Sequence, residues 1–215
     1  DDLVFPEILA HARRARIVNV GKRAGKPSTP QDRINGLLVR LARRGWNVVR
    51  LKGGDPMVFG RGGEELLALR RAGIEADIVP GITSGVAVPA TLGVPVTHRG
   101  LVTGVAFITG QCRDDREPDW AALVRSGLTL VVYMGLARLP RIVESLTRAG
   151  MPASQPALAI QDGTRPTQRH VSAPLSTLAG AVKTAGLAGP CLIVIGEVTR
   201  LAGTDLSTLC IGDAA

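Results

Sequence analysis

The sequence of 215 residues contains 26 Lys and Arg against 18 Asp and Glu, which gives a formal net charge of +8. Hydrophobic residues make up 45% of the chain and aromatic residues only 3%. The chain can therefore bury a core of Val, Leu, Ile and Ala, but it has few rings for stacking on nucleic-acid bases. Such an excess of positive charge can attract nucleic acid, an anionic membrane or a polyanionic small molecule, although a solvated basic surface explains part of it.

The cysteines predict a reducing environment. Cys112, Cys191 and Cys210 are odd in number and lack C-x-x-C spacing, which is typical of free thiols. No stretch is long and apolar enough to span a bilayer, and no charged-then-apolar leader opens the sequence. We therefore expect a cytoplasmic protein.

The first 28 residues are predicted to form a short helix, a strand and a basic loop. Residues 8–12 have helical apolar spacing, and residues 16–20 are typical of a strand that leads into G-K-R-A-G-K at residues 21–26. The glycines of this loop are one residue too close for a phosphate loop, and Pro27 follows it, which excludes a nucleoside-triphosphate site. A mobile basic loop over an anionic substrate is the better interpretation, and an ordinary solvated loop is the alternative.

A helix is predicted to follow. Thr29 is placed as its N-cap, with Pro30 at the first helical position and Asp32 in the positive first turn. Apolar residues then recur at helical spacing over residues 34–41, and Gly45 is expected to end the helix.

The next apolar run begins at Val48 and breaks at Gly53 and Gly54 directly onto Asp55 and Pro56. This pattern predicts a strand that ends in a bend, where the backbone approaches a ligand and Asp55 points at it. Open α/β sheets bind ligands at such strand ends.

Residues 64–71 are predicted to form a helix with Glu64 and Glu65 in its first turn and arginines in its last. Charge complementarity at the helix ends explains the two glutamates better than acid–base chemistry does. A strand at residues 77–79 then leads to Thr83 and Ser84, which open a helix rich in small residues. Their hydroxyls can cap that helix or contact a ligand, and both readings stay open.

Residues 92–104 are predicted to connect two domains. Pro95 and Gly100 flank His98 and Arg99, and no second His or Cys lies at the spacing of a metal site. We therefore expect no metal. The predicted domains are residues 1–98 and 99–215.

The second half alternates between strands and helices. Strands are predicted at residues 105–109, 128–134, 157–160, 168–172 and 191–198, and helices at residues 120–124, 139–149 and 175–184. Asp119 is the expected cap of the first of these helices. The alternation predicts an α/β fold with mixed sheets, mostly parallel, with an antiparallel edge around Gly163.

Four sequence blocks resemble the tetrapyrrole methyltransferases: K-G-G-D-P at residues 52–56, F-G-R-G-G-E-E at 59–65, V-P-G-I-T-S at 79–84 and P-V-T-H-R at 95–99. The resemblance implies the tetrapyrrole methylase fold, with two small α/β domains and the active site in the cleft between them. It also implies a homodimer that uses S-adenosyl-L-methionine and releases S-adenosyl-L-homocysteine. Family members carry an earlier strand and a G-x-G-P-G-D loop, so we expect the native chain to begin before Asp1.

The resemblance also implies a site. Asp1 would be a proton acceptor and Lys22 a proton donor, with Asp2 able to replace Asp1 after a slip of one residue. The methyl donor would be bound by Gly53, Gly54, Asp55, Val58, Thr83, Ser84, Met134 and Gly163. The cations expected around a polyanionic substrate are Lys22, Arg23, Lys52, Arg61 and Arg99, because Lys and above all Arg bind carboxylates well.

The activity implied by the resemblance is C-methylation of uroporphyrinogen III at two ring carbons to give precorrin-2, for sirohaem or cobalamin synthesis. The donor carries an activated methyl group and the reduced ring carbon is nucleophilic, so the protein has chiefly to align them. No Ser-His-Asp constellation is needed and none is visible. The alternatives are a methyltransferase of this fold acting on a later corrin precursor or on diphthamide precursor, or a non-enzymatic module that binds anions or nucleic acid.

Overall fold

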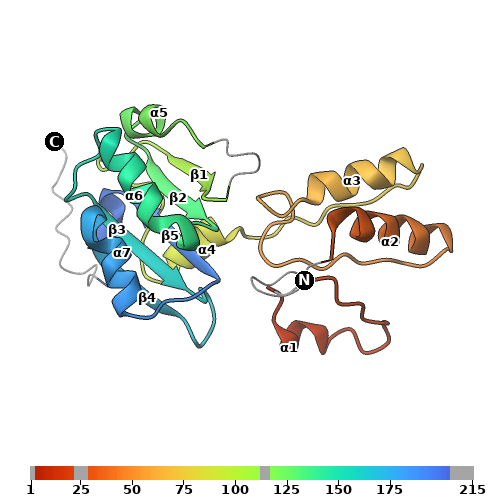
Figure 1. The fold of residues 1–215 in the computed structure, drawn as a ribbon. Coiled ribbons are helices and arrows are strands. Elements are labelled where there is room, and N and C mark those ends of the chain that lie inside the picture. The colour runs from red at the N-terminus through yellow and green to blue at the C-terminus, as the bar shows by residue number, and fades with distance from the viewer. Residues whose placement is uncertain (1–2, 22–28, 112–116, 204–215) are drawn as a thin grey trace. The chain divides into compact units, whose positions relative to one another are not determined.

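The computed structural model of the chain describes residues 3–21, 29–111 and 117–203. The chain divides into two compact units, Asp1–Thr83 and Ser84–Ala215 (Figure 1). The sequence predicts a domain boundary between residues 98 and 99, which is further along the chain than this division. That boundary stays a prediction. Among the described residues, no helix combines the length and the apolar character that crossing a membrane requires.

The first unit is built on helices. They are α1 (Pro6–Leu9), α2 (Gln31–Arg43) and α3 (Gly62–Arg71). α2 packs against α3 and buries Ile34 and Leu38, as its apolar spacing predicts. The predicted cap is wrong by one residue, because Pro30 occupies the N-cap position and no side chain caps the helix. Gly45 ends it with a left-handed φ of 78°.

The strands predicted in this unit are not formed among the described residues. Residues 16–20, 48–51 and 77–79 have no strand structure, and no backbone hydrogen bond joins these segments to one another. Their apolar side chains are accordingly exposed, Val49 by 80% and Val79 by 83%. A strand exists only through hydrogen bonds to a neighbouring strand, and an apolar run does not by itself provide that neighbour.

The second unit contains a five-stranded sheet in the order β1-β2-β5-β3-β4. Its strands are β1 (Val105–Thr109), β2 (Thr129–Tyr133), β3 (Pro156–Gln161), β4 (Arg169–Pro174) and β5 (Cys191–Ile195). β1 pairs with β2 in parallel, whereas β2–β5, β3–β5 and β3–β4 are antiparallel. The prediction of mostly parallel pairing is therefore wrong, because the last strand inserts between β2 and β3 and runs against both. The antiparallel edge around Gly163 is confirmed.

Helices cover both faces of this sheet. α5 (Trp120–Arg125), α6 (Leu139–Arg148) and α7 (Leu175–Thr184) enclose one core, to which β2 and β5 contribute Leu130, Val132 and Ile193. α4 (Ser84–Ala90) packs against β2 and β5. With both faces covered, every residue of β2 is buried. Asp119 caps α5 as predicted, since its carboxylate accepts a hydrogen bond of 2.9 Å from the N–H of Ala122.

The strand directions place three carboxyl ends at one edge of the sheet. Because β1 is parallel to β2, and both β2 and β3 run against β5, the chain leaves β1, β2 and β3 on the same side. Two short helical turns complete the unit, η1 (Leu136–Arg138) directly after β2 and η2 (Glu197–Leu201) after β5. η2 also corrects the predicted end of the last strand, which stops at Ile195.

Candidate active site

In the first unit, Asp55 joins two loops that contain predicted donor-binding residues. Its Oδ1 accepts a hydrogen bond of 2.8 Å from the N–H of Met57, and its Oδ2 accepts one of 3.1 Å from the N–H of Gly81. These backbone donors, together with the N–H of Val58, hold the pKa of the Asp55 carboxyl below its ordinary value. The structure thus brings Gly53, Gly54, Asp55 and Val58 next to the loop that leads to Thr83.

The glycines of these loops are required by the chain's own packing. A Cβ on Gly81 would lie 2.4 Å from the carbonyl oxygen of Gly54, and a Cβ on Gly53 would lie 3.0 Å from the Cβ of Leu3. Gly62 likewise approaches the carbonyl of Pro56, which accepts its N–H at 2.9 Å. A ligand is therefore not needed to explain these glycines, and their contact with one stays a prediction.

Arg61 lies at the start of α3 with a left-handed φ of 59°. Its Nε and Nη2 donate to the two carboxylate oxygens of Glu64 at 2.7 and 2.6 Å, in a two-point contact on an exposed surface. This contact raises the pKa of the guanidinium above its ordinary value. The predicted substrate cation Arg61 thus already has a carboxylate partner, which a substrate carboxylate would have to displace.

Lys52 lies in a buried polar cluster that the sequence did not reveal. Its Nζ is 3.4 Å from Glu65 Oε2, and Glu65 Oε1 also accepts hydrogen bonds from Arg50 Nε at 3.1 Å and Gln31 Nε2 at 3.0 Å. Burial, followed by the neighbouring charge of Arg50, lowers the pKa of Lys52. The one sequence signal is the spacing of Gln31 and Ile34, which places this glutamine on the buried face of α2 and so indicates a buried polar group.

Of the remaining predicted catalytic and substrate-binding residues, the structure describes only Arg99. Asp1, Asp2, Lys22 and Arg23 lie outside the described residues. Arg99 is exposed in the turn after His98, whose backbone forms an isolated bridge with Val102. Within the described ranges, no group of three His, Cys, Asp or Glu side chains could hold a metal ion.

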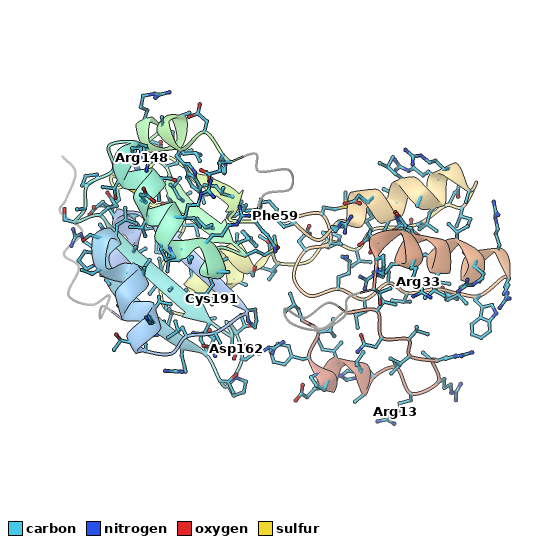
Figure 2. The ribbon with its side chains drawn as sticks, in the orientation of Figure 1. Arg13, Arg33, Phe59, Arg148, Asp162 and Cys191 are labelled. Carbon is cyan, nitrogen blue, oxygen red and sulfur yellow. The ribbon has the colours of Figure 1, made fainter. Side chains whose placement is uncertain are left out.

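In the second unit, the shared edge of β1, β2 and β3 carries unusual backbone geometry. Met134 follows β2 with a φ of 53°, and Asp162 and Thr164 follow β3 with φ of 49° and 67°. Left-handed residues other than glycine are uncommon and cluster at functional sites. Met134 is 48% exposed at this edge, and Asp162 and Cys191 mark the same edge in Figure 2.

α4 brings the remaining predicted donor residues to this edge. The N–H of Gly85, next to Ser84, donates to the phenol oxygen of Tyr133, next to Met134. Gly163 packs against Val88 so closely that a Cβ would lie 2.4 Å from its methyl groups. The structure therefore gathers Ser84, Met134 and Gly163 from three distant parts of the sequence.

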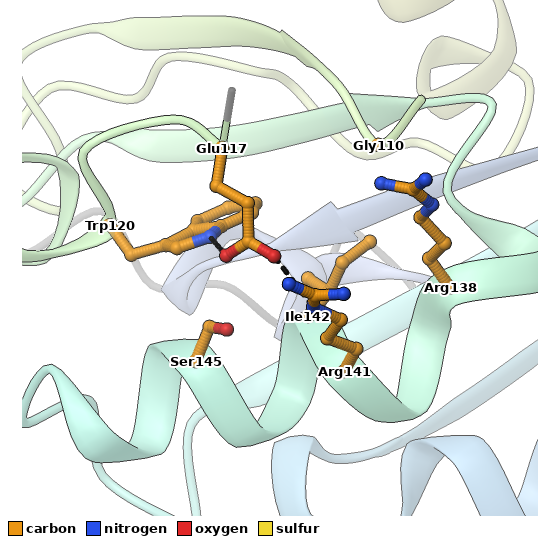
Figure 3. Close-up of a pocket in the computed structure, with 7 residues that line it drawn as sticks. All are labelled: Gly110, Glu117, Trp120, Arg138, Arg141, Ile142 and Ser145. Atoms are coloured by element: carbon orange, nitrogen blue, oxygen red, sulfur yellow. Dashed lines mark hydrogen bonds and ion pairs between the residues drawn. The ribbon is translucent and has the colours of Figure 1, made fainter. Parts of the chain in front are cut away.

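Gly110 and Gly135 hold the ends of β1 and β2 together. A Cβ on Gly110 would lie 2.5 Å from the Cα of Gly135, so neither position has room for a side chain. Beside them is a small pocket, which Figure 3 shows with Glu117 bound to Arg141 Nε at 2.6 Å and to Trp120 Nε1 at 3.2 Å. The guanidinium of Arg138 is directed toward Gly110 (Figure 3), a cation that the sequence analysis missed.

A sequence model of the tetrapyrrole (corrin/porphyrin) methylases matches residues 1–179. The chain belongs to this family. It is 50% identical over 200 residues to a uroporphyrinogen-III C-methyltransferase of Pseudomonas aeruginosa, covering 93% of this chain and 82% of that protein. It is 47% identical to a sirohaem synthase of Methylobacillus flagellatus, covering 94% of this chain but only 44% of that protein.

Among solved structures, this tetrapyrrole methylase is similar to the uroporphyrin-III C-methyltransferase of Thermus thermophilus complexed with S-adenosylhomocysteine. The two are 43% identical in sequence and superpose with a TM-score of 0.71, over 80% of this chain and 75% of that one. The predicted family and the predicted tetrapyrrole methylase fold are therefore confirmed.

A cationic methyl donor fits the residues of this methylase. Such a donor carries an ammonium and a sulfonium group, and a carboxylate such as that of Asp55, which the N–H groups of Met57 and Gly81 hold in place, is chemically suited to cations of this kind.

Proposed function

We propose that this chain transfers methyl groups from S-adenosyl-L-methionine to two ring carbons of uroporphyrinogen III and so produces precorrin-2. The observation that carries the proposal is the 50% identity to a uroporphyrinogen-III C-methyltransferase, because that match covers most of both proteins. The similar Thermus enzyme complexed with S-adenosylhomocysteine supports the choice of donor.

The donor supplies an electrophilic methyl group, and the residues of this chain have to orient it and exclude water. We assign its binding to Gly53, Gly54, Asp55, Val58, Thr83, Ser84, Met134 and Gly163. The anionic Asp55, whose pKa is lowered by backbone N–H groups, stays charged at neutral pH and can face a cation. The left-handed φ of 53° at Met134 turns the chain directly after the end of β2.

The eight carboxylates of uroporphyrinogen III account for part of the excess of basic residues. Of the candidate cations, Lys52 is paired with Glu65 and Arg61 with Glu64, whereas exposed Arg99 has no ion pair within the described ranges. Among the candidate cations that the structure describes, Arg99 is thus the most readily available, and Arg61 would exchange one carboxylate for another. We retain Lys22 and Arg23 as further substrate contacts, Lys22 also as proton donor and Asp1 as proton acceptor.

The test is an anaerobic incubation of the chain with uroporphyrinogen III and the methyl donor, followed by mass analysis of the macrocycle. A product heavier by two methyl groups is expected. A reaction without the donor serves as the control. The variant Arg99→Ala tests the substrate contact and should raise the KM for the macrocycle more than the KM for the donor. An unmodified macrocycle under conditions in which S-adenosylhomocysteine binds would reject uroporphyrinogen III as substrate.

The same assay separates the alternatives. A methyltransferase for a later corrin precursor or for diphthamide precursor would bind the donor but leave uroporphyrinogen III unchanged. A module that binds anions or nucleic acid would lose its ligand steeply with added salt and would be indifferent to the donor.

We also propose a homodimer that works in the cytoplasm and whose product feeds sirohaem or cobalamin synthesis. The sirohaem synthases with which the chain aligns support the first branch. The free thiol of Cys191, whose pKa burial raises to about 11, suits a reducing compartment. Light scattering at several concentrations tests the dimer, and a constant monomer mass would reject it.

A further inference from the structure

A buried hydrogen bond connects two segments of the proposed donor site. The N–H of Gly85, in the first turn of α4, donates to the phenol oxygen of Tyr133 at 2.7 Å, across 48 residues of sequence. Tyr133 is the last residue of β2 and is 8% exposed. The ring of Phe107 contacts it edge-on, with centroids 5.9 Å apart and planes at 79°.

The fit between Tyr133 and Gly85 is specific to these two residue types. A Cβ on Gly85 would lie 2.3 Å from the phenol oxygen and 2.9 Å from the nearest ring carbon of Phe107. Any side chain at Gly85 would push α4 away from β2. A phenylalanine at Tyr133 would keep the ring but would leave the N–H of Gly85 buried without this acceptor.

Both ends of this hydrogen bond adjoin residues assigned to the methyl donor. Gly85 directly follows Ser84, and Tyr133 directly precedes Met134, whose φ is 53°. A left-handed methionine is held only when its surroundings fix it. Here the side chain of the preceding residue, Tyr133, contacts the ring of Phe107 and accepts a hydrogen bond from Gly85 of α4.

We propose that Tyr133 is a positioning residue of the donor site, and that its hydroxyl holds Ser84 and Met134 in the relative placement that binds the donor. This inference rests on the proposed function for the identity of the donor and for the assignment of Ser84 and Met134 to its binding site. Tyr133 acts through its neighbours, because the residue is only 8% exposed and its phenol oxygen accepts the N–H of Gly85 within the unit.

The test compares Tyr133→Phe with Thr129→Val in the intact chain. Both substitutions delete a buried hydroxyl from β2, but Thr129 Oγ1 has no hydrogen-bond partner among the described residues and lies at the other end of the strand. Affinity for S-adenosylhomocysteine is measured by calorimetry at a temperature at which circular dichroism shows all variants fully folded. Thermal unfolding is recorded alongside.

We expect Tyr133→Phe to weaken S-adenosylhomocysteine roughly tenfold, as for the loss of one well-placed hydrogen bond. The KM for the donor should rise by a similar factor, while the KM for the macrocycle stays within about twofold. Thr129→Val should leave both constants unchanged. Gly85→Ala, which displaces α4 from the other side, should repeat the effect of Tyr133→Phe.

A separate readout uses the fact that the chain has one tyrosine. Protein labelled with 3-fluorotyrosine should give one fluorine resonance, which should shift on addition of S-adenosylhomocysteine to saturation. A purely structural role predicts a lower melting temperature with unchanged affinity and an unmoved resonance, and that result overturns the inference. If S-adenosylhomocysteine binds and shifts the resonance but uroporphyrinogen III is not methylated, the substrate assignment fails and the role of Tyr133 stands.

Discussion

Similar apolar runs of sequence are buried in the second unit but exposed in the first. In the second unit, β2 and β5 are covered on both faces and Leu130 and Ile193 are fully buried. In the first unit, the apolar segments around Val49 and Val79 have no strand partner among the described residues, and these side chains are exposed by 80% and 83%. Apolar sequence therefore predicts burial only where neighbouring strands satisfy the backbone.

The largest expected difference between the units comes from one type of substitution made in each. Leu130→Ala in the sheet core should lower the free energy of unfolding by about 3 kcal/mol, since it removes buried methyl groups and leaves a cavity. Leu67→Ala on α3, where the side chain is 51% exposed, should cost less than about 1 kcal/mol.

The two tryptophans allow each unit to be followed separately in urea. Trp46 lies in the first unit and is 52% exposed, whereas Trp120 lies in the second and is 9% exposed. Single-tryptophan variants, Trp46→Phe and Trp120→Phe, report on the units by fluorescence. Equal losses from Leu130→Ala and Leu67→Ala would contradict the contrast in packing.

The first unit should depend instead on its polar cluster. Glu65→Ala removes the partner of Arg50 and Lys52 and should destabilise this unit by about 3 kcal/mol, as expected when a buried ion pair loses one member. Glu64→Ala, which breaks the exposed contact with Arg61, should cost less than about 1 kcal/mol. Trp46 fluorescence in urea measures both, and similar costs would show that the cluster is not a stabilising centre.

A smaller effect tests whether the units unfold independently. Gly36 in α2 and Gly180 in α7 both have open space where a Cβ would be placed. Replacing either with Ala should stabilise its helix by roughly 0.5 to 1 kcal/mol. If the units are independent, Gly36→Ala moves only the Trp46 transition and Gly180→Ala only the Trp120 transition. Movement of both transitions by either variant would indicate one cooperative structure.

The smallest expected effect is a pH dependence in the loop of Asp55. Because the folded-state pKa of this carboxyl is lowered, its contribution to stability is present above its ordinary value, about 4, and is lost as the pH falls through the folded-state pKa. The stability difference between the native chain and Asp55→Asn should therefore shrink on acidification. Urea unfolding from neutral to acid pH measures it, with exposed Asp77→Asn as control, and a constant difference would contradict the assignment.

The sequence predicted what local patterns determine. α7 and β1 have their predicted bounds, and Asp119 caps α5 as expected. Pairing depends on distant segments, which is why the antiparallel insertion of β5 between β2 and β3 could not be predicted from the alternation of strands and helices.

The same limit applies to the candidate site. The Gly53 and Gly54 turn was visible as a break in an apolar run, but the hydrogen bond from Gly81 to Asp55 joins residues 26 positions apart. Glu65 and Tyr133 gave no local signal, because a glutamate in a first helical turn and a tyrosine in a strand are both ordinary. Their roles arise from what the fold places beside them.

The contact between Gly110 and Gly135 has a consequence for engineering this enzyme. A side chain at Gly110 would clash with the backbone of Gly135, so the loops that follow β1 and β2 begin at two positions where only glycine fits. The residues beyond these positions can be varied, but the two glycines cannot. A library that randomises these loops to alter substrate preference should keep both glycines constant. The backbone at the ends of β1 and β2 would then be the same in every variant, so that altered selectivity could be attributed to the loops.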